Sequence, residues 1–207
     1  MRFINDEGRK ELQKFFDDLE STLKLEALGV TLFTVIMELV GNAVKANLKR
    51  VFFRENNFRF DEPESYRAGV DAFKADYENI RKDKYTQALE DLNLTVTVEV
   101  DLNNDRLLTY VENNTVMVFE EEKRVRKKLA DAMKSPELLD FYMNYGDEME
   151  GGGIGLAMII FLIKQMGFDP GHFRVFHRSE KTIARLEFPL KADYVPIRSR
   201  YEKALNG

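Results

Sequence analysis

Apolar residues recur at helical spacing in two stretches near the start of the chain. Residues 9–26 form an amphipathic pattern in which apolar positions fall three or four residues apart, and Gly29 ends it. From Thr31 to Arg50, apolar residues cover most of a helix circumference, while Glu38, Asn42 and Lys45 form a narrow polar stripe. The pattern predicts an N-terminal helix over 1–26 and a second helix whose stripe needs a polar neighbour.

A charged stretch and a β-hairpin are expected next. Residues 64–92 have the pattern of a strongly charged helix with a modest apolar seam, so we interpret 51–93 as a helical insertion. Residues 94–102 alternate apolar and polar side chains with the period of a half-buried strand. Asn103-Asn104-Asp105 predicts a turn, and the partner strand is expected from Arg106 to about Val111.

A long charged segment separates the hairpin from an apolar helix. Residues 118–150 are charged and partly helical, which predicts a long mobile connection rather than core. The glycine-rich stretch from Gly151 to Leu156 then opens directly onto an apolar helix that ends near Gly167. Two strands are expected at 173–177 and 182–188, so the order of elements predicts one α+β domain.

Length and composition limit the class of protein. With 207 residues, 44% hydrophobic and 32% charged, the chain has the balance of one globular domain. The first ten residues are polar, and the longest apolar run, Ile154 to Ile163, is about half of the ~20 residues that span a bilayer. Neither a secretory signal nor membrane insertion is expected. The absence of cysteine excludes disulfides and thiolate metal sites, and it favours a cytoplasmic location.

Charge and histidine content narrow the possibilities further. A net charge of −5 argues against a general nucleic-acid surface. The basic residues 123–128 follow three glutamates, so we interpret them as a solvated helix face. His172 and His177 fall at or in the expected late strands, where packing and surface roles prevail, and neither is expected to accept a phosphoryl group.

The first candidate site lies on the second helix. Glu38 and Asn42 are four residues apart and therefore share one helix face. The amide oxygen of Asn42 suits a hard cation such as Mg²⁺, and the carboxylate of Glu38 suits a base that orients or deprotonates a nucleophile. Taken alone, the same pair also fits an ordinary hydrogen-bonded helix pair.

The second candidate site is the glycine cluster from Gly151 to Gly155. Successive backbone N–H groups without a Cβ, at the N-terminus of a helix, form a natural phosphate cradle. A hinge or a tight turn would need the same residues. The cluster is neither a Rossmann motif, because no strand immediately precedes it, nor a P-loop, because it lacks the Lys-Ser/Thr ending.

Together the two stretches resemble the N-box and the second glycine box of the GHKL superfamily of ATPases, in the same order and spacing. The resemblance implies a Bergerat fold: a two-layer α/β sandwich whose mostly antiparallel sheet is covered by helices on one face. It implies that ATP and Mg²⁺ are bound and that 118–150 is the lid. By position, it makes Asn42 the metal ligand, Glu38 the base and Lys45 a phosphate contact. It also makes Gly151, Gly153 and Gly155 the phosphate cradle, in a motif that ends at Leu156. Thr182 occupies the place of a family residue near the adenine.

One box departs from the family pattern. Where the family has Asp-x-Gly-x-Gly after the hairpin, this chain has Glu112-Asn113-Asn114-Thr115-Val116. Either Glu112 accepts from the adenine amine with a shifted base position, or the adenine site is weak or inactive. Asn114 can adopt a left-handed conformation, whereas Val116 tolerates positive φ poorly. A simple turn that leads into the lid is the other interpretation of Asn113 and Asn114.

The resemblance supports two functions from different classes. The first is an ATP-binding domain of the histidine-kinase or anti-sigma-kinase type that transfers phosphate to a separate protein, such as a response regulator or another regulatory protein, or hydrolyses ATP. The second is a catalytically degenerate module that kept the fold and binds a regulatory partner without turnover, which the altered adenine box favours.

Overall fold

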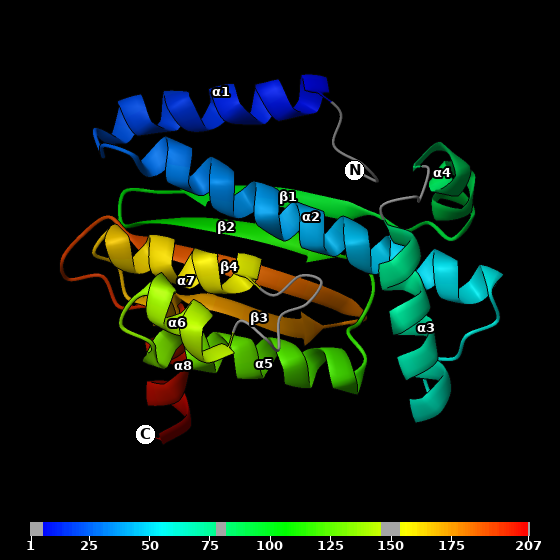
Figure 1. The fold of residues 1–207 in the computed structure, drawn as a ribbon. Coiled ribbons are helices and arrows are strands. Elements are labelled where there is room, and N and C mark those ends of the chain that lie inside the picture. The colour runs from blue at the N-terminus through cyan, green and yellow to red at the C-terminus, as the bar shows by residue number, and fades with distance from the viewer. Residues whose placement is uncertain (1–5, 78–81, 146–153, 207) are drawn as a thin grey trace.

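The protein folds into an α+β, two-layer α/β sandwich in which a four-stranded antiparallel sheet packs against helices (Figure 1). The computed structural model describes residues 6–77, 82–145 and 154–206. The helices and strands follow in the order α1 (Asp6–Leu23), α2 (Leu28–Glu55), α3 (Pro63–Asp76), α4 (Lys82–Asp91), β1 (Val96–Leu102), β2 (Arg106–Asn113), α5 (Phe119–Lys134), α6 (Leu138–Tyr145), α7 (Ile154–Gln165), β3 (Phe173–Arg178), β4 (Lys181–Pro189) and α8 (Ile197–Asn206).

The sheet has the strand order β1-β2-β4-β3, and every neighbouring pair is antiparallel. This confirms the predicted hairpin and the two late strands. Strand β2 runs two residues beyond the predicted end at Val111, because Glu112 and Asn113 pair with Ile183 and Thr182 of β4. Pairing with β4 extends β2, and the alternating pattern of the hairpin alone does not predict this second partner.

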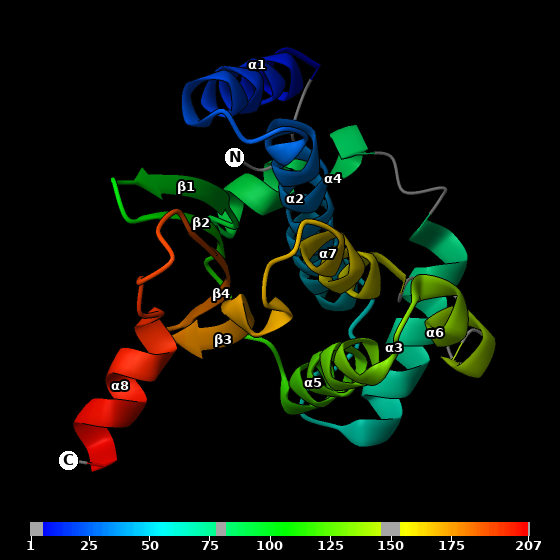
Figure 2. The same cartoon turned by 90° about the vertical axis from the view of Figure 1, so that its left-hand side faces the viewer.

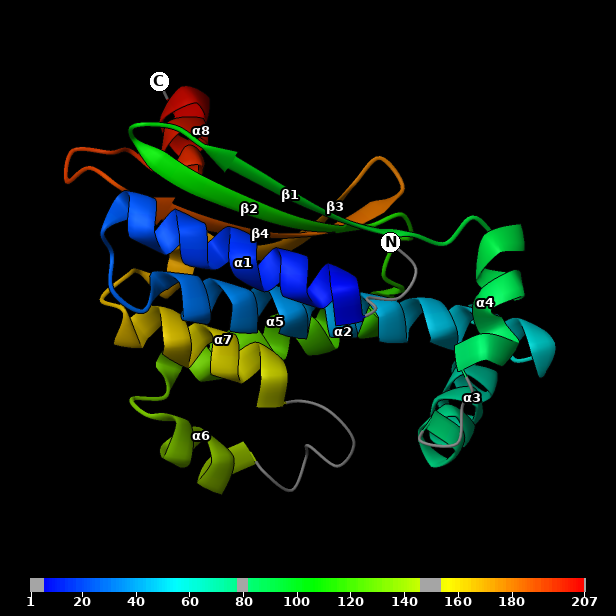
Figure 3. The same ribbon diagram turned by 90° about the horizontal axis from the view of Figure 1, so that it is seen from above.

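Helix α2 is the core helix of the domain. It crosses the sheet beneath α1, and the two helices run side by side (Figure 3). Its buried residues, such as Leu32, Val35 and Ile36, join one cluster with the apolar residues of α1, α7 and the sheet. Among the described helices α2 alone is long and apolar enough to cross a membrane by length and composition, and here it packs as a core helix.

The insertion begins later than predicted, and its described residues form the helices α3 and α4. Residues 51–55 continue α2, because Val51, Phe52 and Phe53 are buried in a second, aromatic-rich cluster. This cluster lies between the end of α2 and the helices α3 and α4, which sit at one end of the molecule (Figure 1). The described residues of the predicted helical stretch over 64–92 form α3 and α4, and the seam residues Tyr66 and Phe73 are buried as expected.

The first part of the predicted lid is packed rather than a loose connection. Helix α5 buries Leu129 and Ala132 in the main core, and α6 buries Phe141. The Lys164 ammonium of α7 donates to the carbonyls of Ala132, Met133 and Ser135 at 3.1, 3.2 and 2.7 Å, which satisfies the free end of α5. The predicted connection is thus wrong for 119–145, while 146–153, including Gly151 and Gly153, lie outside the described residues.

The opposite face of the sheet is partly covered by the C-terminal segment, which no sequence pattern predicted. Glu187 of β4 is 1% exposed and accepts hydrogen bonds from the Tyr194 hydroxyl at 2.5 Å and the Ile197 N–H at 2.9 Å. Burial and this hydrogen bond raise the pKa of Tyr194 to about 12. Helix α8 follows and extends away from the helical layer (Figure 2).

Candidate functional site

The polar stripe of α2 forms a hydrogen-bonded pair near the middle of the helix. The Asn42 amide nitrogen donates to Glu38 Oε1 at 2.9 Å, as their spacing of four residues allows. This bond uses the amide nitrogen and leaves the amide oxygen as an acceptor toward its surroundings. An amide oxygen beside a carboxylate is a donor set that suits a hard cation such as Mg²⁺.

The start of α7 lies directly against this pair. A Cβ atom placed on Gly155 would be 1.7 Å from Glu38 Oε1 and 2.3 Å from its carboxyl carbon. Only glycine allows so close an approach of the α7 backbone to the carboxylate. The described end of the glycine-rich stretch and the Glu38/Asn42 face, far apart in sequence, therefore meet in space.

A cavity of about 270 Å³ opens beside this contact, between α2, α3, α5, α7 and the sheet. Its size is near the lower end of the range for small-molecule pockets. Four of the residues predicted from the sequence line it: Asn42, Lys45, Leu156 and Thr182. Glu38 and Gly155 adjoin the cavity through Asn42 and Leu156 without lining it, and neither histidine lines it.

Two predicted adenine contacts lie elsewhere. The Glu112 carboxylate accepts from the Lys181 ammonium at 2.7 Å, on the side of β2 that faces away from the cavity. The Asn114 side chain accepts from the Thr95 N–H at 2.8 Å and donates to the Asn93 carbonyl at 2.5 Å, so it fastens the start of β1. The structure does not bring Glu112 or Asn114 to the cavity, because strand alternation turns both of them away from it.

Asn113 and Thr115 occupy the cavity wall instead, and sequence reasoning missed both. Asn113 is 4% exposed and its amide nitrogen donates to the Ala43 carbonyl at 3.3 Å. Asn113 Oδ1 and Thr115 Oγ1 are buried with no hydrogen-bond partner among the described residues. Strand parity was the available signal: Val111 faces the core, so the residue two positions later faces the same way.

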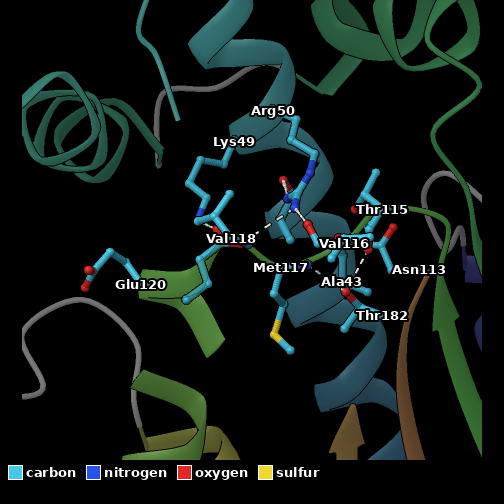
Figure 4. A network of polar contacts seen from close by, with 12 residues as sticks. Ala43, Lys49, Arg50, Asn113, Thr115, Val116, Met117, Val118, Glu120 and Thr182 are labelled. Carbon is cyan, nitrogen blue, oxygen red and sulfur yellow. Dashed lines mark hydrogen bonds and ion pairs between the residues drawn. The ribbon is translucent and has the colours of Figure 1, made fainter. Parts of the chain in front are cut away.

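A polar network fixes the segment that connects β2 to α5 (Figure 4). The Thr182 hydroxyl donates to the Thr115 carbonyl at 2.7 Å and accepts from the Met117 N–H at 3.1 Å. The Arg50 guanidinium donates to the Val116 carbonyl. No positive φ is found at residues 112–116, so Asn114 does not adopt the left-handed conformation that its residue type allows. The network holds the wall of the cavity on the framework of α2 and β4.

The cavity is strongly cationic, in contrast to the net charge of −5 of the whole chain. Among the described residues that line it, six side chains are cationic and one is a carboxylate, Glu121, which gives a formal charge of 6 − 1 = +5. The six cations come from α2, α3 and α5: Lys45, Lys49, Arg50, Lys74, Arg124 and Lys128. The cavity can therefore hold an anion of several charges.

Glu121 binds two of these cations. Its carboxylate pairs with Lys49, lies 3.6 Å from the Arg50 guanidinium, and accepts from the Val118 N–H at 3.1 Å at the start of α5. Burial acts to raise the pKa of Glu121, but Lys49 and Arg50 outweigh it, so the pKa lies below its ordinary value. Burial lowers the pKa of Lys49 despite the carboxylate. Glu121 faces two cations, so we assign it as charged near neutral pH.

Metal binding at this site would rely on few protein ligands. No group of three or more histidine, aspartate or glutamate side chains that could hold a metal ion is found in the described part of the chain. A Mg²⁺ ion that is bound by one amide oxygen would take its other ligands from a phosphate chain and water, as this ion commonly does. The arrangement of Asn42, Glu38 and the cationic wall fits a magnesium-phosphate ligand rather than a metal alone.

The protein is thus an α/β sandwich with a cationic cavity between its helices and its sheet. No family model matches the chain, and no solved structure matches it. An uncharacterized protein of Treponema pallidum (strain Nichols) is 34% identical over 155 residues, which cover 74% of this chain and 30% of that protein. The matched part of the chain therefore covers under a third of the length of that relative.

Proposed function

We propose that this chain is a Mg²⁺-dependent ATP-binding domain of the histidine-kinase or anti-sigma-kinase type, with the triphosphate in the cationic cavity. One observation carries the proposal. The first turn of α7 lies against Glu38, whose hydrogen-bond partner Asn42 lines a cavity with a formal charge of +5. A helix N-terminus, an amide ligand and several cations around one space are complementary to a magnesium-bound phosphate chain.

The described residues divide between the two ends of such a ligand. Asn42 would hold Mg²⁺ through its amide oxygen, and Lys45 would contact phosphate. At the β2 end of the cavity, Asn113 Oδ1 is a buried acceptor with no partner among the described residues, which suits an exocyclic amine such as that of adenine. In this proposal Asn113 takes the role that was predicted for Glu112, and Thr115 adds a second polar contact.

The chemistry we propose is transfer of the terminal phosphoryl group. Mg²⁺, when bound, would neutralise charge on the phosphate oxygens. Glu38 would accept the proton of the attacking hydroxyl, imidazole or water as the new P–O or P–N bond forms. The bond between the terminal phosphorus and the bridging oxygen breaks, and ADP leaves with that oxygen. Placement and charge compensation by the cavity would supply most of the rate.

The acceptor would be a separate regulatory protein in the cytoplasm. Helix α6 exposes three large apolar side chains at helical spacing, Leu139, Tyr142 and Met143, which are 67%, 54% and 76% exposed. A row of exposed apolar residues marks a surface for a protein partner. The same surface favours the second candidate, a module that binds a regulatory protein without turnover.

Calorimetry on an Asn42 variant tests the proposal. Replacing Asn42 by Ala removes the amide ligand and should abolish Mg²⁺-dependent ATP binding, while the parent binds. Asn104→Ala is the matched control, because Asn104 is an exposed residue of the β1–β2 turn and does not line the cavity. Equal affinity of ATP for the Asn42 variant and the parent would show that the assignment of the metal ligand is wrong.

A further inference from the structure

Four cations of the cavity form a group that is separate from the Glu121 ion pairs. Lys45 comes from α2, Lys74 from α3, and Arg124 and Lys128 from α5. We call them the four-cation cluster. Glu121, the carboxylate among the described lining residues, binds Lys49 and Arg50 instead. Glu38, next to the cavity, acts on the charge of Lys45 from the α2 side. The four cations thus gather on one wall of the cavity, beside Glu38 and the Glu121 ion pairs.

Tyrosines at the α3 end of the insertion place two of these cations. The Arg124 guanidinium donates to the Tyr66 hydroxyl at 2.6 Å, and Tyr66 is itself 5% exposed. The Lys45 ammonium lies over the ring of Tyr77, 4.5 Å from its centroid. A cation from α5 and a cation from α2 are thereby both held against α3 and the residue that caps its C-terminus. The insertion therefore orders the charged wall of the cavity in addition to extending the core.

The close approach of like charges is unfavourable for the protein without a ligand. Burial lowers the pKa of Lys45, and the charge of Lys74 lowers it further. Burial also lowers the pKa of Lys128, and so do the charges of Arg124, Lys74 and Lys45. Cations from three helices thus act on Lys128. An anion placed among them would relieve this repulsion and would gain charge-assisted hydrogen bonds.

We propose that the four-cation cluster binds the terminal phosphates of the ligand, and that Lys74 of the insertion is a phosphate-binding residue. This inference rests on the proposed function in taking the polyphosphate from a nucleotide. It places the base toward Asn113 and Thr115 and the phosphate chain toward α3 and α5. The insertion would then distinguish a triphosphate from a monophosphate, since a longer chain reaches cations that a shorter one does not.

The test compares ligands of different phosphate length on Lys74 variants of the full chain. Calorimetry with Mg²⁺-ATP, AMP and inorganic tripolyphosphate should show that Lys74→Gln weakens ATP and tripolyphosphate about tenfold and leaves AMP unchanged. Lys74→Arg should bind ATP and tripolyphosphate with most of the affinity of the parent, because it keeps the charge. Arg67→Gln is the matched control, since Arg67 is an exposed cation of the same helix that does not line the cavity. Circular dichroism would verify that each variant is folded.

The outcomes separate this inference from the proposed function. If ATP binds the parent and Lys74→Gln equally well, the cluster does not hold phosphate, while ATP binding stands. If tripolyphosphate binds and depends on Lys74, but ATP binds no tighter than tripolyphosphate, the cluster is a polyphosphate site and the nucleotide assignment fails. If tripolyphosphate and ATP both fail to bind the parent, the inference is overturned outright.

Discussion

Gly155 is the residue at which the two halves of the candidate site meet. Replacing it by Ala would place a Cβ atom 1.7 Å from Glu38 Oε1, which is far inside van der Waals contact. Because a carboxylate is the far end of a flexible side chain, it should move aside, and Asn42 would lose its partner. We expect Gly155→Ala to weaken Mg²⁺-ATP binding at least tenfold while the domain stays folded, as calorimetry and thermal denaturation would show.

Gly41 provides the control for that prediction. It lies in the middle of α2, one residue from Asn42, and a Cβ placed on it has no atom within 4 Å. Gly41→Ala should raise the free energy of unfolding by about 0.5–1 kcal/mol through helix propensity and leave nucleotide affinity unchanged. Should Gly155→Ala bind ATP as well as Gly41→Ala does, the contact with Glu38 has no role in the site.

At the scale of single residues, some site residues could be predicted from the sequence, and others were missed because of the alternation of side chains along a strand. Asn42, Lys45, Leu156 and Thr182 were predicted, and all four line one cavity. Glu112 was chosen by chemical likeness to an aspartate, although a strand presents alternate residues to alternate faces. Asn113 shares its face with the buried Val111, so residue parity, rather than residue type, decides which polar side chain reaches the cavity.

Helix α5 is tied to α2 by one carboxylate, and this makes its docking dependent on pH. The folded pKa of Glu121 lies below its ordinary value of 4.5, so its contribution to stability is present above that value. The contribution is lost as pH falls through the folded pKa. We expect the parent to lose roughly 1–3 kcal/mol of unfolding free energy across this acid range through this group. Urea denaturation at a series of pH values would measure it.

Glu121→Gln is the variant that isolates this effect. It keeps the shape of the side chain and the contact with the Val118 N–H but carries no charge to titrate. The variant should be less stable than the parent at neutral pH, and the difference should shrink below about pH 4. A constant difference between the two proteins from neutral to acid pH would mean that the Glu121 charge does not hold α5 in place.

Elements with strong periodicity were predicted well, and elements that depend on distant partners were not. The helices α1, α2 and α7 and the hairpin follow directly from the spacing of their apolar residues. The helices α5 and α6 were taken for a connection, because α5 buries only the narrow seam of Leu129 and Ala132 against α7. The many charged residues of α5 made this short apolar seam hard to recognise in the sequence. Arg124 is exposed, as expected of a solvated face, and it also lines the cavity together with the half-buried Lys128.

At the scale of the whole molecule, the cavity joins regions that are far apart in the chain. Its wall includes residues from α2, α3, the β2–α5 segment, α5, α7 and β4. A ligand that contacts all of these elements binds the folded state and cannot bind the unfolded chain in the same way. Binding should therefore stabilise the domain as one unit, by an amount that depends only on ligand concentration and affinity.

This linkage gives the last prediction, which also separates the two candidate functions. ATP with Mg²⁺ at 100 times its dissociation constant should stabilise the fold by about 2.7 kcal/mol. For a domain of this length, that corresponds to a rise in the midpoint of thermal denaturation of roughly 5–11 °C. The rise should disappear in Asn42→Ala and when a chelator removes Mg²⁺. A module that only binds a protein partner would show no rise with ATP, because ATP would not bind its folded state.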